Sequence, residues 1–292
     1  MRQTMEDAAD RLVSPIAAAG RADLITEFAA PLAITLISDL VGLERPCRAA
    51  FFRWIDRCAT PDAHAHVVES LENIRGLLCA LVAKKRAAPA NDLISRLVTA
   101  CDEREELDDA EVIATAFLIL LTGYEAPTHL IGNGVLSLLR HPDQMRKVRE
   151  DRTLVAALVE ETLRFEGPVE TAPTVYATEE MRIGDVTISP GEAVLVSLAG
   201  ANRDPRKFRD PESFDVQRDA TGHLTFGRGV HHCLGAHYSR LFGEIAFRAL
   251  FRATDEIQAD FREDDLRWRN GVIIRGLRSL PVKLPANASS RE

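Results

Sequence analysis

The stretch Phe226-Gly227-Arg228-Gly229-Val230-His231-His232-Cys233-Leu234-Gly235 determines how the whole sequence is interpreted. One cysteine stands near the end of this glycine-punctuated loop, and a helical-looking run, Ala236 to Leu250, follows it. Backbone N–H groups and the helix dipole at a helix N-terminus favour a thiolate over a thiol. The sequence therefore predicts that Cys233 is held as a thiolate at the start of a helix.

The neighbours of Cys233 suit a flat, apolar partner. Gly227 and Gly229 remove side chains where such a partner could lie against the backbone, and Gly235 allows close packing beyond it. Phe226 supplies an apolar wall. A thiolate in such a loop is suited to axial ligation of haem iron.

Two other interpretations stay open at this point. Each glycine taken singly can be an ordinary turn residue, and the cysteine can be a small buried apolar residue. His231, His232, Cys233 and His237 could instead form a zinc site, although adjacent histidines point apart and no second cysteine pair lies nearby.

The composition limits the partners and the compartment. Lys+Arg 36 against Asp+Glu 44 gives a net charge of −8, which argues against nucleic acid or an anionic membrane as a partner. The five cysteines are odd in number and irregularly spaced, as expected in a reducing compartment. The first residues lack the apolar segment of a signal peptide, and the longest apolar run, Val112 to Leu121, is too short to span a bilayer. We therefore expect a soluble, cytoplasmic protein.

The ordered pattern F-G-x-G-x-H-x-C-x-G resembles the cysteine-ligand loop of bacterial cytochrome P450 enzymes. The resemblance implies a mainly α-helical cytochrome P450 fold with a small β portion, and haem b (iron protoporphyrin IX) as the cofactor. It makes Cys233 the proximal ligand to the iron and His231 a contact to the haem propionates. Arg228 is either a second propionate contact or a surface residue. Whole family members carry more chain before the first matching segment, so we expect an N-terminally shortened P450 fold. The sequence is a fragment, a mis-started reading frame or a naturally shortened relative.

The resemblance covers nearly the whole chain and implies one domain over residues 1–292. The expected parts are outer helices over 1–107, a central distal helix over 108–140, a Glu-Arg helix with a small sheet and a meander over 153–220, the haem-ligand loop and helix over 221–252, and C-terminal strands over 253–285.

Local signals give finer expectations. A break at 20–23 precedes an apolar helix, Phe28 to Leu43, and further helices open at Pro46 and at Pro61-Asp62. Short strands are expected over 174–177, 181–188 and 193–198, and paired strands over 266–269 and 272–277.

The segment Thr122-Gly123-Tyr124-Glu125-Ala126-Pro127-Thr128 resembles the oxygen-activation centre of the family's distal helix. Gly123 and Glu125 match that centre, but Ala126 replaces the threonine that normally helps to deliver protons. A methyl group cannot donate a hydrogen bond, so that route is missing. Pro127 lacks the N–H that would bond to the carbonyl of Gly123, and we expect the helix to open there. The alternative is a plain proline kink in a core helix.

Glu161 and Arg164 form an E-x-x-R pair on one face of a helix. Such a pair is usually a solvated surface feature. Its position between the distal helix and the cysteine loop resembles the structural pair of the P450 family, which implies a bracing role outside the chemistry. Ser213 stands where many members have a basic residue of the same network, and Arg218 is close enough in sequence to compensate.

The resemblance implies oxidation of a small organic molecule in specialised metabolism, using dioxygen and electrons from a ferredoxin. Residues 221–250 contain three arginines and four histidines against one acid, which suits an acidic electron donor. The alternative is a catalytically silent relative that acts as a partner or scaffold for another enzyme. The missing N-terminal elements, Ala126 and Ser213 favour that alternative, as does Val175, which stands where many relatives place an arginine on a haem propionate. The intact cysteine loop opposes it.

Overall fold

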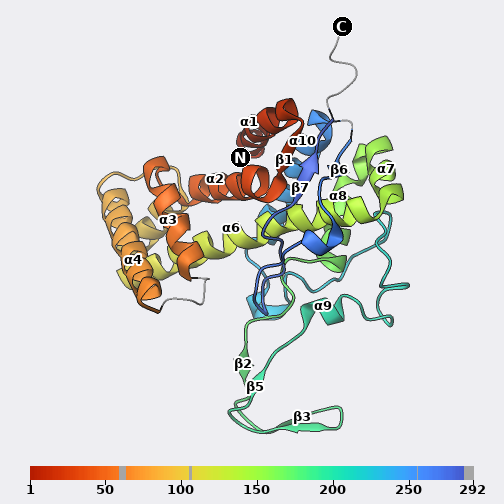
Figure 1. The fold of residues 1–292 in the computed structure, drawn as a ribbon. Coiled ribbons are helices and arrows are strands. Elements are labelled where there is room, and N and C mark those ends of the chain that lie inside the picture. Colours follow the sequence, from red (N-terminus) through yellow and green to blue (C-terminus); the bar gives the residue numbers. More distant parts are fainter. Residues whose placement is uncertain (59–63, 105–106, 255, 286–292) are drawn as a thin grey trace. The chain divides into compact units, whose positions relative to one another are not determined.

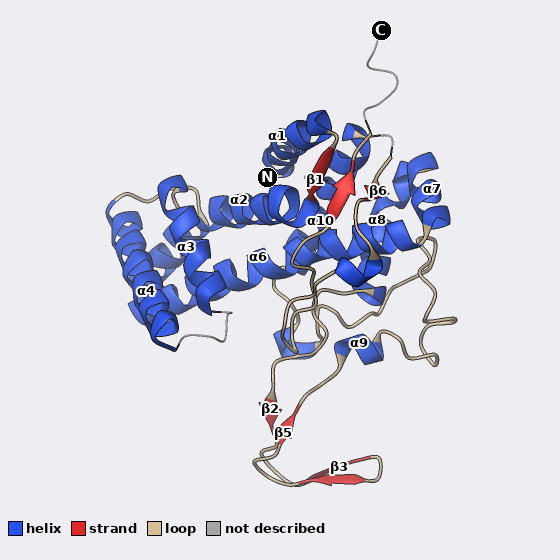
Figure 2. Ribbon diagram, viewed as in Figure 1, coloured by secondary structure: helices blue, strands red, loops and turns tan. Residues whose placement is uncertain are grey.

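The computed structural model describes residues 1–58, 64–104, 107–254 and 256–285. Contacts group the chain into two compact units, one of Met1–Ala29 with Ala126–Glu292 and one of Ala30–Glu125. The chain runs from the red N-terminal helices to the blue C-terminal segments (Figure 1). Most elements are helices, and the strands are short (Figure 2). A mainly α-helical protein with a small β portion was predicted, and this is confirmed; the single domain over 1–292 stays a prediction.

In the described part of residues 30–125, every regular element is a helix. This unit contains α2 (Ala30–Val41), α3 (Arg45–Cys58), α4 (His64–Ala87), α5 (Leu93–Arg104) and the first part of α6 (Asp109–Arg140). Buried side chains from all five helices form its core, among them Ile37, Phe51, Leu78, Ile94 and Leu120. Pro46 lies in the first turn of α3, as predicted. The predicted helix start at Pro61-Asp62 lies outside the described residues.

The other unit joins both parts of the chain that flank this helical unit. Its helices are α1 (Arg2–Ala19), the π-helix η1 (Ile25–Ala29), the rest of α6, α7 (Pro142–Glu150), the 3-10 turn η2 (Arg152–Leu154), α8 (Val155–Phe165) and α10 (Ala236–Ala253). α1 packs on α10, and Arg252 at the end of α10 forms an ion pair with Asp10.

A three-stranded sheet in the same unit was not predicted. β1 (Arg21–Asp23) pairs antiparallel with β7 (Pro281–Lys283), with Ala22 opposite Val282, and β7 also pairs with β6 (Gln258–Ala259). The predicted break between helices at 20–23 is present, since α1 ends at Ala19 and the next helical element begins at Ile25, but the strand within it was missed. Only Gly20 is a turn residue: it ends α1 in a left-handed conformation, and β1 follows directly.

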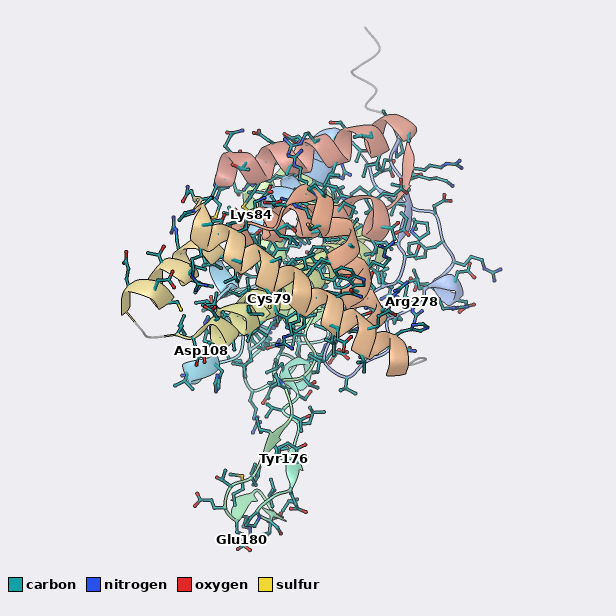
Figure 3. The ribbon with its side chains drawn as sticks, turned by 90° about the vertical axis from the view of Figure 1, so that its left-hand side faces the viewer. Cys79, Lys84, Asp108, Tyr176, Glu180 and Arg278 are labelled. Carbon is teal, nitrogen blue, oxygen red and sulfur yellow. The ribbon has the colours of Figure 1, made fainter. Side chains whose placement is uncertain are left out.

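The remaining strands form two small hairpins. β2 (Val175–Tyr176) pairs with β5 (Ala193–Val194), and β3 (Met181–Ile183) pairs with β4 (Val186–Ile188). The predicted single strand over 181–188 is thus two strands, because Gly184 adopts a positive φ of 59° and turns the chain. Figure 3 labels Tyr176 and Glu180 on this segment, whose apolar side chains are largely exposed.

The segments around these hairpins also differ from expectation. α9 (Leu198–Ala201) begins where the third predicted strand should end, because Ser197 caps it by accepting the Gly200 N–H at 3.0 Å. Residues 266–277 pair only at isolated bridges, such as Trp268 with Leu277. The 3-10 turns η3 (Gly229–His231) and η4 (Glu263–Asp265) complete the described elements.

α6 is long and apolar enough to cross a membrane by length and composition, and the bent pair Ile25–Val41 with Arg45–Cys58 passes the same test if taken as one span. The sequence analysis judged the ten-residue run Val112 to Leu121 too short to span a bilayer. It overlooked the length of α6, because the apolar character continues along this 32-residue helix. The core helix of a soluble protein passes the same test, so the finding does not assign α6 to a membrane.

Candidate functional site

The Cys233 loop is fixed by hydrogen bonds within its own backbone. The Cys233 N–H donates to the carbonyl of Phe226 at 2.8 Å, which closes the loop at its base. Gly227 and Gly229 have φ values of 68° and 85°, a left-handed conformation that glycine adopts without a side-chain penalty. Gly235 is the N-cap residue of α10, and the Ala236 N–H donates to the Cys233 carbonyl at 3.2 Å. The predicted cysteine loop before a helix is therefore present.

The outer face of this loop is exposed. Cys233, Arg228 and His231 are exposed, and the apolar side chains of Val230 and Leu234 are 97% and 95% exposed. A Cβ added at Gly229 would meet no atom within 4 Å. A haem needs a ligand for its iron and an apolar surface for its flat ring. The Cys233 thiol, the exposed apolar side chains and the open glycine backbone fit these two needs. Among the described residues, no group of three or more His, Cys, Asp or Glu could hold a metal ion, so the four zinc candidates do not come together.

Glu161 and Arg164 are both on α8 and their side chains are completely buried. The Arg164 guanidinium binds both carboxylate oxygens of Glu161, each at 2.7 Å. It also donates to the carbonyls of Asn202, Pro211 and Ser213 at 2.9–3.1 Å. A buried ion pair needs this kind of complete hydrogen bonding to repay its desolvation. The pair is therefore a core feature, and the solvated surface pair is excluded for these two residues.

The comparisons with known proteins agree with this arrangement. The family model for Cytochrome P450 matches residues 33–253. The chain belongs to the cytochrome P450 family. It is 41% identical over 286 residues to Cytochrome P450 107B1 of Saccharopolyspora erythraea, which covers 97% of this chain and 70% of the relative. It is 38% identical over 287 residues to the 6-deoxyerythronolide B hydroxylase of the same organism, with 97% and 71% covered.

A solved P450 structure has the same fold. The Bacillus subtilis bacillaene polyketide synthase cytochrome P450 PksS superposes with a TM-score of 0.92 at 33% identity, covering 97% of this chain and 74% of that one. The P450 fold and a monooxygenase type of enzyme, both predicted, are confirmed. Haem b is the cofactor of this family.

Arg218 completes the Glu161 network of this P450. Its Nε lies 3.3 Å from Glu161 Oε1, and its other nitrogens donate to the carbonyls of Arg209, Asp210 and Ser213. Ser213 itself contributes only its carbonyl oxygen. The predicted compensation for the missing basic side chain at 213 is therefore present.

A second ion-paired network was missed in the sequence. Glu160, next to Glu161 on α8, accepts two hydrogen bonds from Arg240 of α10 at 2.6 and 3.1 Å and contacts His223 Nε2 at 3.2 Å. Burial raises the pKa of the Glu160 carboxyl, but the hydrogen bonds from His223 and Arg240 outweigh it and lower the pKa to about 2. The doubled Glu160-Glu161 was the available signal, since adjacent helical positions face different neighbours.

The distal segment is a continuous part of α6. α6 runs unbroken through Pro127, so the predicted opening does not occur as a break in the helix. A Cβ added at Gly123 would overlap the side chain of Ile37, which gives this glycine a packing role against α2. Glu125 and Ala126 are half-buried. Their catalytic roles, and that of Gly123, stay predictions.

Two residues after Pro127, His129 is buried beneath the backbone of Gly276, where an added Cβ would overlap the imidazole ring. Burial, together with the charge of Arg269, lowers the pKa of His129 to about 4. His129 is therefore neutral at physiological pH. Sequence reasoning missed this residue because a single histidine in an apolar helix carries no motif.

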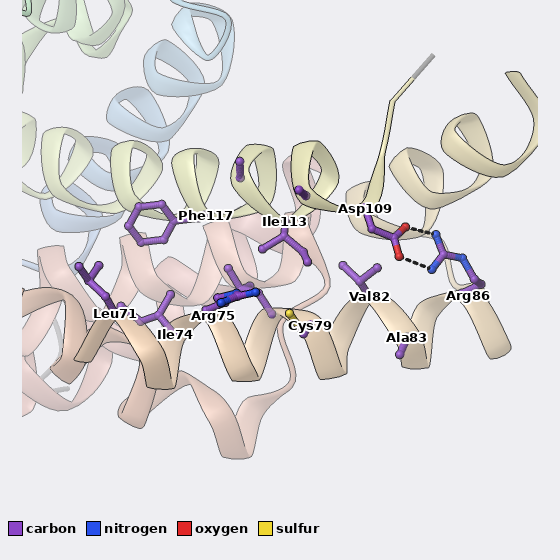
Figure 4. Close-up of a pocket in the computed structure, with 13 residues that line it drawn as sticks. Leu71, Ile74, Arg75, Cys79, Val82, Ala83, Arg86, Asp109, Ile113 and Phe117 are labelled. Atoms are coloured by element: carbon purple, nitrogen blue, oxygen red, sulfur yellow. Dashed lines mark hydrogen bonds and ion pairs between the residues drawn. The ribbon is translucent and has the colours of Figure 1, made fainter. Parts of the chain in front are cut away.

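An apolar groove of about 560 Å³ lies between α4 and the first part of α6. Figure 4 shows Leu71, Ile74 and Phe117 along it and the Arg86–Asp109 ion pair beyond Val82. None of the predicted site residues lines this groove.

Proposed function

We propose that this P450 is a cytoplasmic haem-thiolate monooxygenase in which Cys233 ligates the haem iron. The single observation that carries the proposal is the Cys233 loop, which presents one thiol on an exposed apolar face and is anchored at the Phe226 carbonyl. The substrate is a small organic molecule of specialised metabolism, and the names of the hydroxylase and polyketide relatives support a polyketide-like substrate class.

The chain's own residues supply binding and orientation. His231 and Arg228 are exposed hydrogen-bond donors on the loop, and they suit the carboxylates of the haem propionates. Gly227, Gly229 and Gly235 keep the backbone accessible, and Phe226 supplies the apolar wall. When bound, haem activates dioxygen and carries out the oxidation.

Proton delivery differs from the family pattern at residue 126. Ala126 has no hydroxyl, so it neither accepts nor donates a proton. We propose that a substrate hydroxyl or a water takes that role, with Gly123 and Glu125 forming the rest of the distal segment.

A ferredoxin is the proposed electron donor. His232 and His237 are exposed and residues 227–237 contain no acid, which leaves a surface around the loop that suits an acidic partner. Arg240 belongs to the Glu160 ion pair and His223 is buried, so the basic surface is smaller than the composition suggested.

The test is haem titration of the full chain, followed by reduction and exposure to carbon monoxide. We expect a Soret band at the thiolate-ligated position that is lost in Cys233→Ala and kept in Cys79→Ala, since Cys79 is also exposed but belongs to α4. Retention of the band in Cys233→Ala would contradict the ligand assignment. A wild-type chain that binds no haem would instead favour the catalytically silent partner.

A further inference from the structure

Two neighbouring carboxylates on α8 serve two separate networks. Glu161 binds Arg164 and Arg218, and it also accepts the Asp215 N–H at 2.9 Å. Glu160 turns toward the other side and binds Arg240 and His223. The first network braces the segment from residue 202 to residue 218, whereas the second reaches the cysteine loop.

The two residues held by Glu160 both contact the side chain of Phe226. The Arg240 guanidinium carbon is 4.5 Å from the centre of the Phe226 ring, a cation–π distance. The His223 ring centre is 5.7 Å from the same ring. Glu160 therefore holds two of the groups that contact the Phe226 ring, and His232 of the loop, with its ring centre at 6.4 Å, is a third.

Phe226 connects this network to the cysteine. Its carbonyl oxygen accepts the Cys233 N–H, the bond that closes the loop. His223 is fixed from the other end as well, because its Nδ1 accepts the Thr225 N–H at 3.2 Å, and Thr225 Oγ1 donates to the Leu163 carbonyl of α8 at 2.5 Å. The segment before the loop is thus tied to α8 by the side chains of residues 223 and 225, and α10 after the loop is tied to it by Arg240.

We propose that Glu160 is a positioning residue for Cys233: its carboxylate holds Arg240 and His223 against Phe226, and this fixes the carbonyl that anchors the Cys233 N–H. The consequence for the haem site rests on the proposed function, but the effect on the loop does not. The carboxylate also balances the charge of Arg240 beside the loop, so its loss leaves a net positive charge near the thiolate.

The test variant is Glu160→Gln, which keeps the shape of the side chain and removes its charge. The matched control is Glu263→Gln, because Glu263 binds Arg140 in the same two-pronged geometry at 3.1 and 2.6 Å on an exposed surface. Without haem, we expect hydrogen exchange of the Cys233 amide and alkylation of its thiol, followed by peptide mass spectrometry, to be roughly tenfold faster in Glu160→Gln. Unchanged exchange and alkylation would overturn the proposal.

A second measurement uses the haem-loaded chain. We expect Glu160→Gln to raise the reduction potential and to shift part of the carbon monoxide complex out of the thiolate-ligated band, with neither change in Glu263→Gln. An unchanged potential and band would overturn the role at the haem site. If the wild-type chain bound no haem, the proposed function would fail, whereas the exchange experiment would still decide the role of Glu160.

Arg240→Lys keeps the proposal testable if Glu160→Gln does not fold. Lysine retains the positive charge but loses the two-pronged contact and the flat stacking on Phe226. We expect faster exchange at Cys233 in this variant too, and exchange at the wild-type rate would contradict the positioning role.

Discussion

The α8 network and the Cys233 loop lie in the same compact unit but are built in opposite ways. Glu161 and Arg164 are completely buried, and their hydrogen-bonding groups are paired with one another and with backbone carbonyls. Val230 and Leu234 of the loop are almost fully exposed. The buried network around Glu161 and Arg164, here called the framework, satisfies its charges and hydrogen bonds within the polypeptide. The loop instead exposes apolar side chains. Changes in the framework should alter the free energy of unfolding, and changes in the loop should mainly alter ligand binding.

The largest effect on stability is expected for Glu161→Gln, which tests whether the buried network supports the fold. It leaves the guanidinium of Arg164 buried without its counter-charge, so we expect the free energy of unfolding to fall by about 3–5 kcal/mol. Urea denaturation followed by circular dichroism measures this. A loss below about 1 kcal/mol, the range of surface pairs, would show that the network does not support the fold.

The pH dependence of stability tests another buried residue, His129. Its pKa is about 4 in the folded chain against 6.5 for the ordinary side chain. As pH falls from 6.5 to 4, the unfolded chain takes up a proton that the folded chain excludes. The free energy of unfolding should therefore fall by about 3 kcal/mol over this window. An NMR titration of the His129 ring with a midpoint near 6.5 would contradict the prediction.

Arg218→Ala tests whether Arg218 belongs to the buried network of Glu161 and Arg164. The variant removes one of the two cations bound to Glu161, while Arg164 keeps its bidentate contact. Hydrogen bonds to charged groups contribute about 1.5–3 kcal/mol, so we expect a loss of about 2 kcal/mol in chemical denaturation. A matched control is Arg206→Ala, whose side chain is 89% exposed and pairs only locally with Asp204. Equal effects of the two variants would show that Arg218 does not complete the network.

The smallest effect on stability is expected in the loop itself. Gly229→Ala places a side chain on a backbone with φ of 85° but meets no neighbouring atom, so the cost is the conformational strain of about 1–2 kcal/mol. Val230→Ser should change the free energy of unfolding by less than about 0.5 kcal/mol. Both should weaken haem binding in a spectroscopic titration more than they change stability. If both variants bound haem as tightly as the wild type, the assignment of the loop to the haem site would be contradicted.

The parts of the structure that could be predicted from the sequence are those marked by several characteristic residues within a short segment. The distal helix, the E-x-x-R pair and the cysteine loop each carry several ordered residues within a short segment, and so does the helix start at Pro46. The three-stranded sheet could not be predicted in this way, because its strands have two or three residues and no alternating pattern. Their pairing depends on residues far apart in the chain.

The same reasoning explains what was missed in the site. Glu160 has the sequence features of an exposed helical acid, and its partners lie 63 and 80 residues away. His129 sits in an apolar helix, and its neutrality results from burial under Gly276, which no local pattern reveals. The ion pairing of Glu160 and the neutrality of His129 both result from tertiary contacts, which the residue types alone do not reveal.

The pairing of β1 with β7 also has a consequence for how the chain is made. Ala22 and Val282 face each other across the sheet, and the Leu284 N–H donates to the Gly20 carbonyl at 2.8 Å. The ribosome therefore adds 260 residues (282 − 22) after Ala22 before its partner exists. At about 5–20 residues per second, β1 waits on the order of 13–50 s for that partner. Until β7 is made, the backbone groups of β1 that pair with it have no strand partner and bind water instead.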